Sequence, residues 1–267
     1  MSSFGRVADK QSKMFDSVWK PPPEELVLEN DEVHVWLVSI NSGSISELEH
    51  IISNDERTRA ARFHLSIHKT EYVASRIYLR TILGKYTGIS PQLLRFEYNE
   101  YGKPTIADET NSNLKFNLSH SHGLALYAFT LDHEIGVDFE LVNPLPVSEE
   151  IAVKALTASE LMLFKRLTTN EQVEFFYKCW TRKEAYSKAI GKGLITNPNK
   201  IETLYLFDEP VVESKINEIF SKTFDCSIVE LPSINGFAAS LAMEGTSKSN
   251  LKCWVSSHKW ILLANSQ

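Results

Sequence analysis

The chain carries one helical pattern twice, and this repeat restricts its fold more than any other feature. A Ser-Asn-Asp-Glu segment begins at Ser53, and a Thr-Ala-Ser-Glu segment begins at Thr157. Both have the form of a capping box, in which a hydroxyl and a glutamate satisfy the first amides of a helix. A long helical pattern follows each start and is predicted to stop at Gly84 and Gly191. The starts lie 104 residues apart and the stops 107, so the sequence predicts a duplicated architecture.

Strand-like sequence accompanies both helical patterns. The predicted strand segments are 32–40, 93–106, 116–130, 135–140, 200–207 and 236–243. Strands and helices that are mixed in this way predict an α+β fold of two similar lobes, each with a small antiparallel sheet packed on a long helix. Clefts between lobes are common places for small-molecule sites, so the active site is predicted there. The predicted divisions are an extended N-terminal arm (1–30), an N-terminal lobe (31–142) and a C-terminal lobe (143–267).

Composition limits the possible partners and the compartment. The chain has 267 residues, 43% of them hydrophobic, which is enough for one large or two small domains. A formal net charge of -6 argues against a nucleic-acid partner. Neither a membrane-spanning stretch nor the apolar segment of a signal peptide is recognisable, so we expect a cytoplasmic protein without a membrane partner. The three well-separated cysteines suit a reducing compartment and are interpreted as packing residues.

Two carboxylates stand at the end of the apolar segment Ile-Gly-Val-Asp-Phe-Glu. Side chains of a strand alternate between its faces, so Asp138 and Glu140 are predicted to share one face above Gly136. Neighbouring carboxylates raise each other's pKa unless water, a proton or a cation lies between them. The ordinary alternative is a strand that ends in solvent, and only the surrounding sequence can decide between the two.

Three further segments place polar side chains at the ends of predicted elements. Residues 100–104 form a predicted turn that carries Lys103, and residues 116–121 bring Ser119 and His120 to a strand end. Residues 180–188 place Glu184 and Lys188 four apart, with Trp180 on the same helix face.

Each of these segments also has an ordinary structural explanation: a turn lysine, a strand-end histidine, a surface ion pair and a core tryptophan. Together, however, the four segments offer three carboxylates, two lysines, a histidine and a serine. Carboxylates suit Mg²⁺ that is shared with phosphates, and the lysines and the histidine suit the remaining negative charge of the phosphates. The combination therefore predicts a magnesium-phosphate site.

The four segments, in this order and followed by Gly-Lys-Gly-Leu at 191–194, resemble those of the Sfp-type 4'-phosphopantetheinyl transferases. The resemblance covers roughly residues 45–200, and Trp-x-x-Lys-Glu-Ala at 180–185 resembles the branch associated with polyketide and nonribosomal peptide synthesis. It implies the two-lobed fold of this family, with coenzyme A bound between the lobes. Phe139 departs from the Ile or Val usual between the two acids and leaves the acids intact.

The resemblance also implies a reaction and roles for the residues. The 4'-phosphopantetheine arm of coenzyme A would move to a serine of an apo acyl or peptidyl carrier protein domain, for polyketide, nonribosomal peptide or fatty acid synthesis, and 3',5'-ADP would be released. Asp138, Glu140 and Glu184 would hold Mg²⁺. Either Glu184 or a water would accept the serine proton, and Lys188 would neutralise charge on the phosphates. The remaining coenzyme A phosphate ligands would be Arg59, Lys103, Ser119 and His120.

The sequence leaves two other functions open. The chain could be a non-catalytic homologue that binds coenzyme A or a carrier protein, or a magnesium-dependent pyrophosphate hydrolase. A single chain of two similar lobes is expected to act as a monomer.

The predicted contact with the carrier protein follows the second capping box and includes Leu161, Met162, Phe164, Lys165 and Arg166. The alternative for Leu161 and Phe164 is the hydrophobic core.

Overall fold

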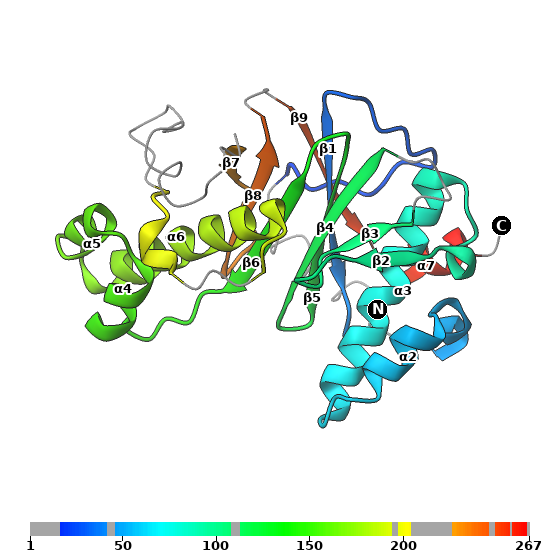
Figure 1. Ribbon diagram of the computed structural model, residues 1–267, viewed down its shortest axis with the longest axis horizontal. Coiled ribbons are helices and arrows are strands. Elements are labelled where there is room, and N and C mark those ends of the chain that lie inside the picture. Colours follow the sequence, from blue (N-terminus) through cyan, green and yellow to red (C-terminus); the bar gives the residue numbers. More distant parts are fainter. Residues whose placement is uncertain are drawn as a thin grey trace, which may run out of the picture. The chain divides into compact units, whose positions relative to one another are not determined.

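The computed structural model describes residues 17–41, 46–107, 113–193, 197–203, 226–245, 249–256 and 258–265. The chain forms two compact units (Figure 1). Unit 1 contains the described residues of Met1–Trp19 and His133–Lys248, and unit 2 contains those of Lys20–Asp132 and Ser249–Gln267. Each unit combines a small sheet with one long helix, which confirms the predicted α+β class. None of the described helices is long and apolar enough to cross a membrane.

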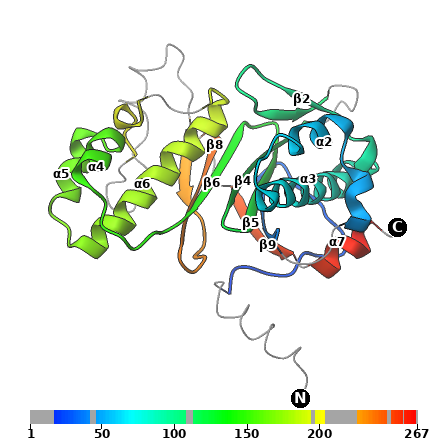
Figure 2. The same ribbon diagram turned by 90° about the horizontal axis from the view of Figure 1, so that it is seen from below.

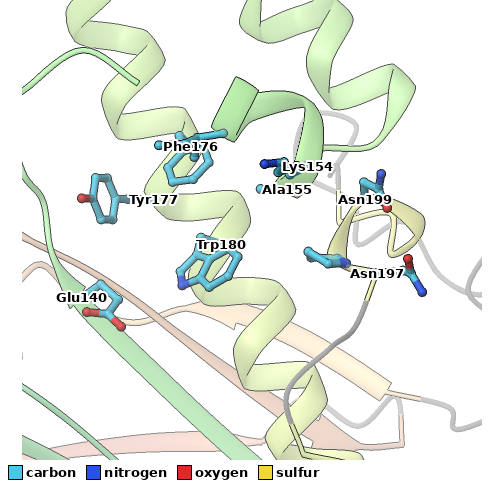
Figure 3. Close-up of a pocket in the computed structure, with 10 residues that line it drawn as sticks. Glu140, Lys154, Ala155, Phe176, Tyr177, Trp180, Asn197 and Asn199 are labelled. Atoms are coloured by element: carbon cyan, nitrogen blue, oxygen red, sulfur yellow. The ribbon is translucent and has the colours of Figure 1, made fainter. Parts of the chain in front are cut away.

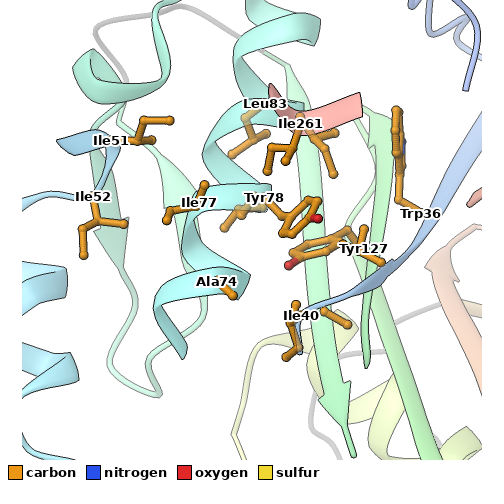
Figure 4. Packing of buried hydrophobic residues seen from close by; sticks show 14 of the residues in the cluster. Trp36, Ile40, Ile51, Ile52, Ala74, Ile77, Tyr78, Leu83, Tyr127 and Ile261 are labelled. Carbon is orange, nitrogen blue, oxygen red and sulfur yellow. The ribbon is translucent and has the colours of Figure 1, made fainter. Parts of the chain in front are cut away.

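Unit 2 is built on a four-stranded sheet in the order β4-β5-β1-β9. Its strands are β1 (Glu32–Ser39), β4 (Leu114–Ser121), β5 (Leu124–Leu131) and β9 (Asn250–Ser256). β1 runs antiparallel to β5 and parallel to β9, so the sheet of unit 2 is mixed and not wholly antiparallel as predicted. The core includes Trp36 and Tyr127 from the sheet, Tyr78 from helix α3 (Ser66–Thr87) and Ile261 from helix α7 (His258–Ala264) (Figure 4). The smaller elements are η1 (Ser46–Ile51), α2 (Asn54–Ala60), η2 (Pro91–Leu93) and the hairpin β2–β3 (Phe96–Tyr98, Pro104–Ile106).

Helix α3 ends later than the sequence predicted. It continues through Gly84 and stops at Gly88, which has a φ of 71° and is a left-handed cap. Gly84 permits close packing between α3 and the chain that follows it, because a Cβ there would lie 2.8 Å from the carbonyl oxygen of Ile89. The predicted stop at Gly84 was therefore wrong, although the capping box at Ser53 is present.

Unit 1 contains a three-stranded antiparallel sheet in the order β6-β8-β7. Its strands are β6 (Ile135–Leu141), β7 (Cys226–Glu230) and β8 (Phe237–Glu244), and its helices are α4 (Glu149–Ala155), α5 (Ala158–Phe164), α6 (Thr169–Ile190) and the short η4 (Pro198–Lys200). Helix α6 packs along β6 and β8 (Figure 2). The capping box at Thr157 and the helix stop at Gly191 are both present, as predicted.

The described part of the chain differs from the predicted strands: β7 and β9 were not predicted, and one predicted strand is absent over its described residues. Residues 198–200 form η4 and residues 201–203 are not in a strand, whereas the rest of the predicted strand 200–207 lies outside the described residues. The units also divide the chain at other points than the predicted lobes, whose boundaries stay a prediction. The strand that carries Asp138 belongs to unit 1, together with α6.

Candidate active site

Strand β6 and helix α6 bring together the four site residues predicted in unit 1. Lys188 Nζ lies 2.6 Å from Asp138 Oδ1 and donates a second hydrogen bond to the Val137 carbonyl at 3.2 Å. Asp138 is almost fully buried, while Lys188 remains partly exposed. The predicted phosphate-binding lysine therefore pairs with one of the predicted metal ligands.

Glu184 lies one turn before Lys188 on α6, and its carboxylate is in an unfavourable place for a negative charge. Only 8% of the residue is exposed. Burial raises the pKa of Glu184, nearby Asp138 and Glu140 raise it further, and Lys188 acts in the opposite direction. Asp138 and Glu140 are thus close enough to influence Glu184. A carboxylate with a raised pKa is a better proton acceptor near neutral pH than an ordinary one.

Gly136 permits the close approach of β6 and α6 that creates this cluster. A Cβ at this position would lie 2.0 Å from the Ala185 carbonyl oxygen and 2.3 Å from the Ala189 amide nitrogen. These are backbone atoms that no rotamer change can move. Because Gly136 is two residues before Asp138 on the same face of the strand, it controls the distance from Asp138 to the helix. The predicted alternation along β6 therefore agrees with the structure.

The donor set fits a magnesium ion that is shared with a substrate. Among the described residues, no three His, Cys, Asp or Glu side chains are grouped closely enough to enclose a metal ion. Asp138, Glu140 and Glu184 nevertheless form a cluster of hard oxygen donors whose like charges raise the pKa of Glu184. Mg²⁺ keeps several waters and is commonly held by one or two carboxylates together with substrate phosphates. A closed protein cage is therefore not required.

The other predicted site residues lie in unit 2. The Lys103 amide donates to Asn99 Oδ1 at 2.9 Å within the turn of the β2–β3 hairpin, and Gly102 has a φ of 85° that suits this turn. The guanidinium of Arg59, on α2, lies 4.9 Å from the centre of the Tyr98 ring, in cation–π geometry. This contact brings α2 to the same hairpin that carries Lys103.

Ser119 and His120 are neighbours near the end of β4, as predicted. Ser119 is buried and His120 is exposed. Successive strand residues point to opposite faces, which agrees with this difference. Of the two, His120 is the more exposed residue.

A pocket in unit 1 was not predicted from the sequence. Its volume is about 640 Å³, and Glu140 lies at its edge beside the α6 aromatics Phe176, Tyr177 and Trp180 (Figure 3). The rest of its lining comes from α4 and the region of η4, and consists of Ile151, Lys154, Ala155, Asn197, Pro198 and Asn199. The aromatic sequence at 175–180 was the available signal. The contributions of α4 and η4 depend on long-range packing, which sequence spacing does not show.

Part of the predicted contact with a carrier protein is hydrophobic core. Phe164 is buried among the core residues of α4, α5 and α6, and Leu161 packs against the same cluster. Lys165 forms an ion pair with Glu149 at 2.7 Å. Met162 is 59% exposed and remains available for a partner. The core alternative was therefore correct for Phe164 and fits Leu161.

Comparison with known proteins identifies the family. Residues 134–242 match the model described as the 4'-phosphopantetheinyl transferase superfamily, and residues 41–130 match the model of the 4'-phosphopantetheinyl transferase N-terminal region. The chain is 34% identical over 235 residues to the 4'-phosphopantetheinyl transferase HetI of Nostoc sp., which covers 87% of this chain and 96% of that protein. The chain belongs to the 4'-phosphopantetheinyl transferase superfamily. It is an enzyme of this family, as the resemblance implied.

Other proteins are also similar to this phosphopantetheinyl transferase. It is 31% identical to the 4'-phosphopantetheinyl transferase Sfp of Bacillus subtilis over 54% of this chain and 62% of that protein. A solved structure of a holo-(acyl-carrier-protein) synthase from Bacillus anthracis, in complex with CoA, is 24% identical over 43% of this chain and 96% of that chain, with a TM-score of 0.34. The family membership rests on the sequence matches.

Proposed function

We propose that this protein transfers the 4'-phosphopantetheine arm of coenzyme A to a serine hydroxyl of apo acyl or peptidyl carrier protein domains. The observation that carries the proposal is the cluster in unit 1, where Lys188 contacts Asp138 and lies one turn after Glu184. Phosphoryl transfer depends mainly on positioning and on stabilising charge, and this cluster has the groups for both.

Glu184 and Lys188 have distinct roles in the proposed reaction. The serine oxygen attacks the phosphorus that carries pantetheine, and the bond from this phosphorus to the bridging oxygen of the pyrophosphate breaks. The serine proton passes to the Glu184 carboxylate, and 3',5'-ADP leaves with the bridging oxygen. Lys188 stabilises the negative charge that develops on this oxygen. The raised pKa of Glu184 supports its role as the base.

Magnesium would be held by Asp138, Glu140 and Glu184 in this proposal. A bound Mg²⁺ would offset the negative charge of the pyrophosphate and of the carboxylates around it. Lys188 already pairs with Asp138, so the same lysine can turn to a phosphate oxygen when the substrate is present.

The remaining parts of coenzyme A have candidate ligands as well. Lys103, Ser119 and His120 are proposed to bind its phosphates, and Arg59 its 3'-phosphate. The pocket beside Glu140 is lined largely by apolar and aromatic side chains, which suits the methyl and amide groups of the pantetheine arm. The proposed acceptors are carrier domains of polyketide, nonribosomal peptide or fatty acid synthesis.

Mass spectrometry of the acceptor tests this function. Purified protein, Mg²⁺ and coenzyme A are incubated with an apo carrier domain, and the intact carrier is weighed. The carrier is expected to gain one phosphopantetheine group, and a carrier whose acceptor serine is replaced by alanine is the matched control. An unchanged carrier mass with intact coenzyme A would indicate a non-catalytic binding protein. Cleavage of coenzyme A without any carrier would indicate a hydrolase.

Substitution of Arg59 tests its place at the 3'-phosphate. Arg59→Ala is expected to raise KM for coenzyme A about tenfold with little change in kcat, because contacts made equally in the ground and transition states affect binding more than turnover. Dephospho-coenzyme A lacks this phosphate, so the variant should use it almost as well as coenzyme A, whereas the wild type should prefer coenzyme A. Arg57→Ala, on the same helix, is the matched control. Equal discrimination between the two substrates by Arg59→Ala and the wild type would remove Arg59 from this site.

A further inference from the structure

Lys183 is a buried basic residue that has no role in the proposed reaction. It stands between Trp180 of the pocket and Glu184 of the carboxylate cluster, and none of its surface is exposed. Its Nζ lies 2.5 Å from Glu160 Oε2 and 2.6 Å from the carbonyl oxygen of Ala155. Glu160 is equally buried. The pair thus connects α6 with the start of α5 and the end of α4.

Glu160 extends the connection to a third segment. Its Oε2 accepts the Thr157 amide at 2.8 Å in the capping box of α5. Its Oε1 accepts the Thr203 amide at 3.2 Å and the Thr203 hydroxyl at 2.9 Å. Thr203 follows η4, so one ion pair ties together α4, α6 and the chain after η4. Residues of α4, α6 and η4 also line the pocket beside Glu140.

Unit 2 also contains a capping-box glutamate that forms ion pairs with the long helix. Glu56 of the first capping box accepts hydrogen bonds from Arg76 at 2.5 Å and Arg80 at 2.7 Å. Arg80 and Lys183 are each the fifteenth residue of a 22-residue helix. In both units, therefore, a capping-box glutamate anchors the long helix that follows it. Arg80 is followed by Thr81, however, whereas Lys183 is followed by Glu184.

A buried ion pair is a weak explanation for stability by itself, because its desolvation offsets most of the attraction between the charges. It can instead fix one arrangement of the elements that it joins. Successive helix residues are about 100° apart around the axis, so holding Lys183 sets the direction in which Glu184 points. Lys188 follows on the same helix. A displacement of about 1 Å at a reacting group can lower the rate about 100-fold.

We propose that Lys183 and Glu160 are a positioning pair that fixes the rotation of α6 and thereby aims Glu184 and Lys188 at the reacting phosphate. The proposal rests on the proposed transfer reaction. Because the ligands proposed for the coenzyme A phosphates include Arg59, Lys103 and His120 outside α6, loss of the pair should affect turnover more than coenzyme A binding.

A charge-free double variant, Glu160→Gln with Lys183→Met, separates positioning from stability. Removing both charges avoids leaving either one buried without its partner. We expect a folded protein by circular dichroism, a kcat for transfer at least tenfold below wild type, and a Kd for coenzyme A by calorimetry within threefold of wild type. Lys178→Met is the matched control, since it removes an exposed α6 ion pair to Glu230. Its kcat should equal that of the wild type.

Charge-preserving variants give a second test that does not require the double variant to fold. Glu160→Asp keeps the charge but shortens the reach to Lys183, so it should lower kcat. Adding Lys183→Arg, which is longer, should restore at least part of the lost kcat. A folded charge-free variant with wild-type kcat, or a folded Glu160→Asp protein with wild-type kcat, would overturn the proposal. A wild-type protein without transfer activity would instead overturn the proposed function, so the two failures are distinguishable.

Discussion

Replacing Glu184 with glutamine is expected to lower kcat for transfer at least about 100-fold and, at the same time, to make the protein more stable at neutral pH. General-base catalysis contributes roughly 100- to 10,000-fold, and glutamine cannot accept the serine proton. Glutamine also removes a charge that is buried and close to Asp138 and Glu140. Lys188 keeps its contact with Asp138, so no charge is left without a partner.

The stability gain has a defined pH dependence. The pKa of Glu184 is raised in the folded protein above its ordinary value of 4.5. A raised pKa means that the folded state binds the proton more tightly than the unfolded state, so protonated Glu184 favours folding. This contribution is complete below about pH 4.5 and is lost as the pH rises through the folded-state pKa. The glutamine variant should therefore match the wild type near pH 4 and exceed its melting temperature at pH 7 to 8.

Thermal unfolding across this pH range, in the presence of a chelator, measures the effect. The chelator matters because a bound cation would stabilise the wild-type carboxylates and reduce the difference. Glu174→Gln is the matched control, since Glu174 is an exposed glutamate on the same helix and its loss should change neither activity nor the pH dependence. Equal melting temperatures for Glu184→Gln and wild type at pH 8 would contradict the inferred cost of the charged Glu184 side chain.

Local signals allowed much of the fold and part of the site to be predicted from sequence. Capping boxes and strand alternation act over two to four residues, so the starts at Ser53 and Thr157 and the shared face of Asp138 and Glu140 could be read directly. Gly84 shows the limit of this reasoning. It looked like a helix stop, but its lack of a side chain serves a contact with Ile89, which only the folded chain reveals.

Local sequence signals also did not predict which strand and helix contact β6. The sequence placed the acid strand at the end of the first lobe, whereas it pairs with β8 and packs on α6 within unit 1. The same is true of Lys183. Its spacing from Glu184 was visible in the sequence, but its ion pair with Glu160 spans 23 residues and depends on how α5 folds back on α6. Long-range contacts of this kind determine how the site is held together.

Gly136→Ala is expected to be the most damaging small substitution in unit 1. The added methyl group would lie 2.0 Å from the Ala185 carbonyl oxygen and 2.3 Å from the Ala189 amide nitrogen. Since both are helix backbone atoms, α6 must move away from β6. Overpacking a core usually costs about 1 to 3 kcal/mol, and a contact with backbone belongs at or above the upper end. We therefore expect a loss of about 3 kcal/mol or more in the free energy of unfolding, measured by urea denaturation.

The matched control is Gly88→Ala, which distinguishes a steric effect from backbone strain. Gly88 has a φ of 71°, and nothing lies within 4 Å of the position that its Cβ would occupy. This substitution should therefore cost only the roughly 1 to 2 kcal/mol of a left-handed non-glycine residue. Gly136→Ala should also lower kcat in the protein that remains folded, because Asp138 follows on the strand while Glu184 and Lys188 lie on the helix that is displaced. If Gly136→Ala proves no more destabilising than Gly88→Ala and keeps full activity, α6 can separate from β6 without consequence, and the cluster does not depend on their close packing.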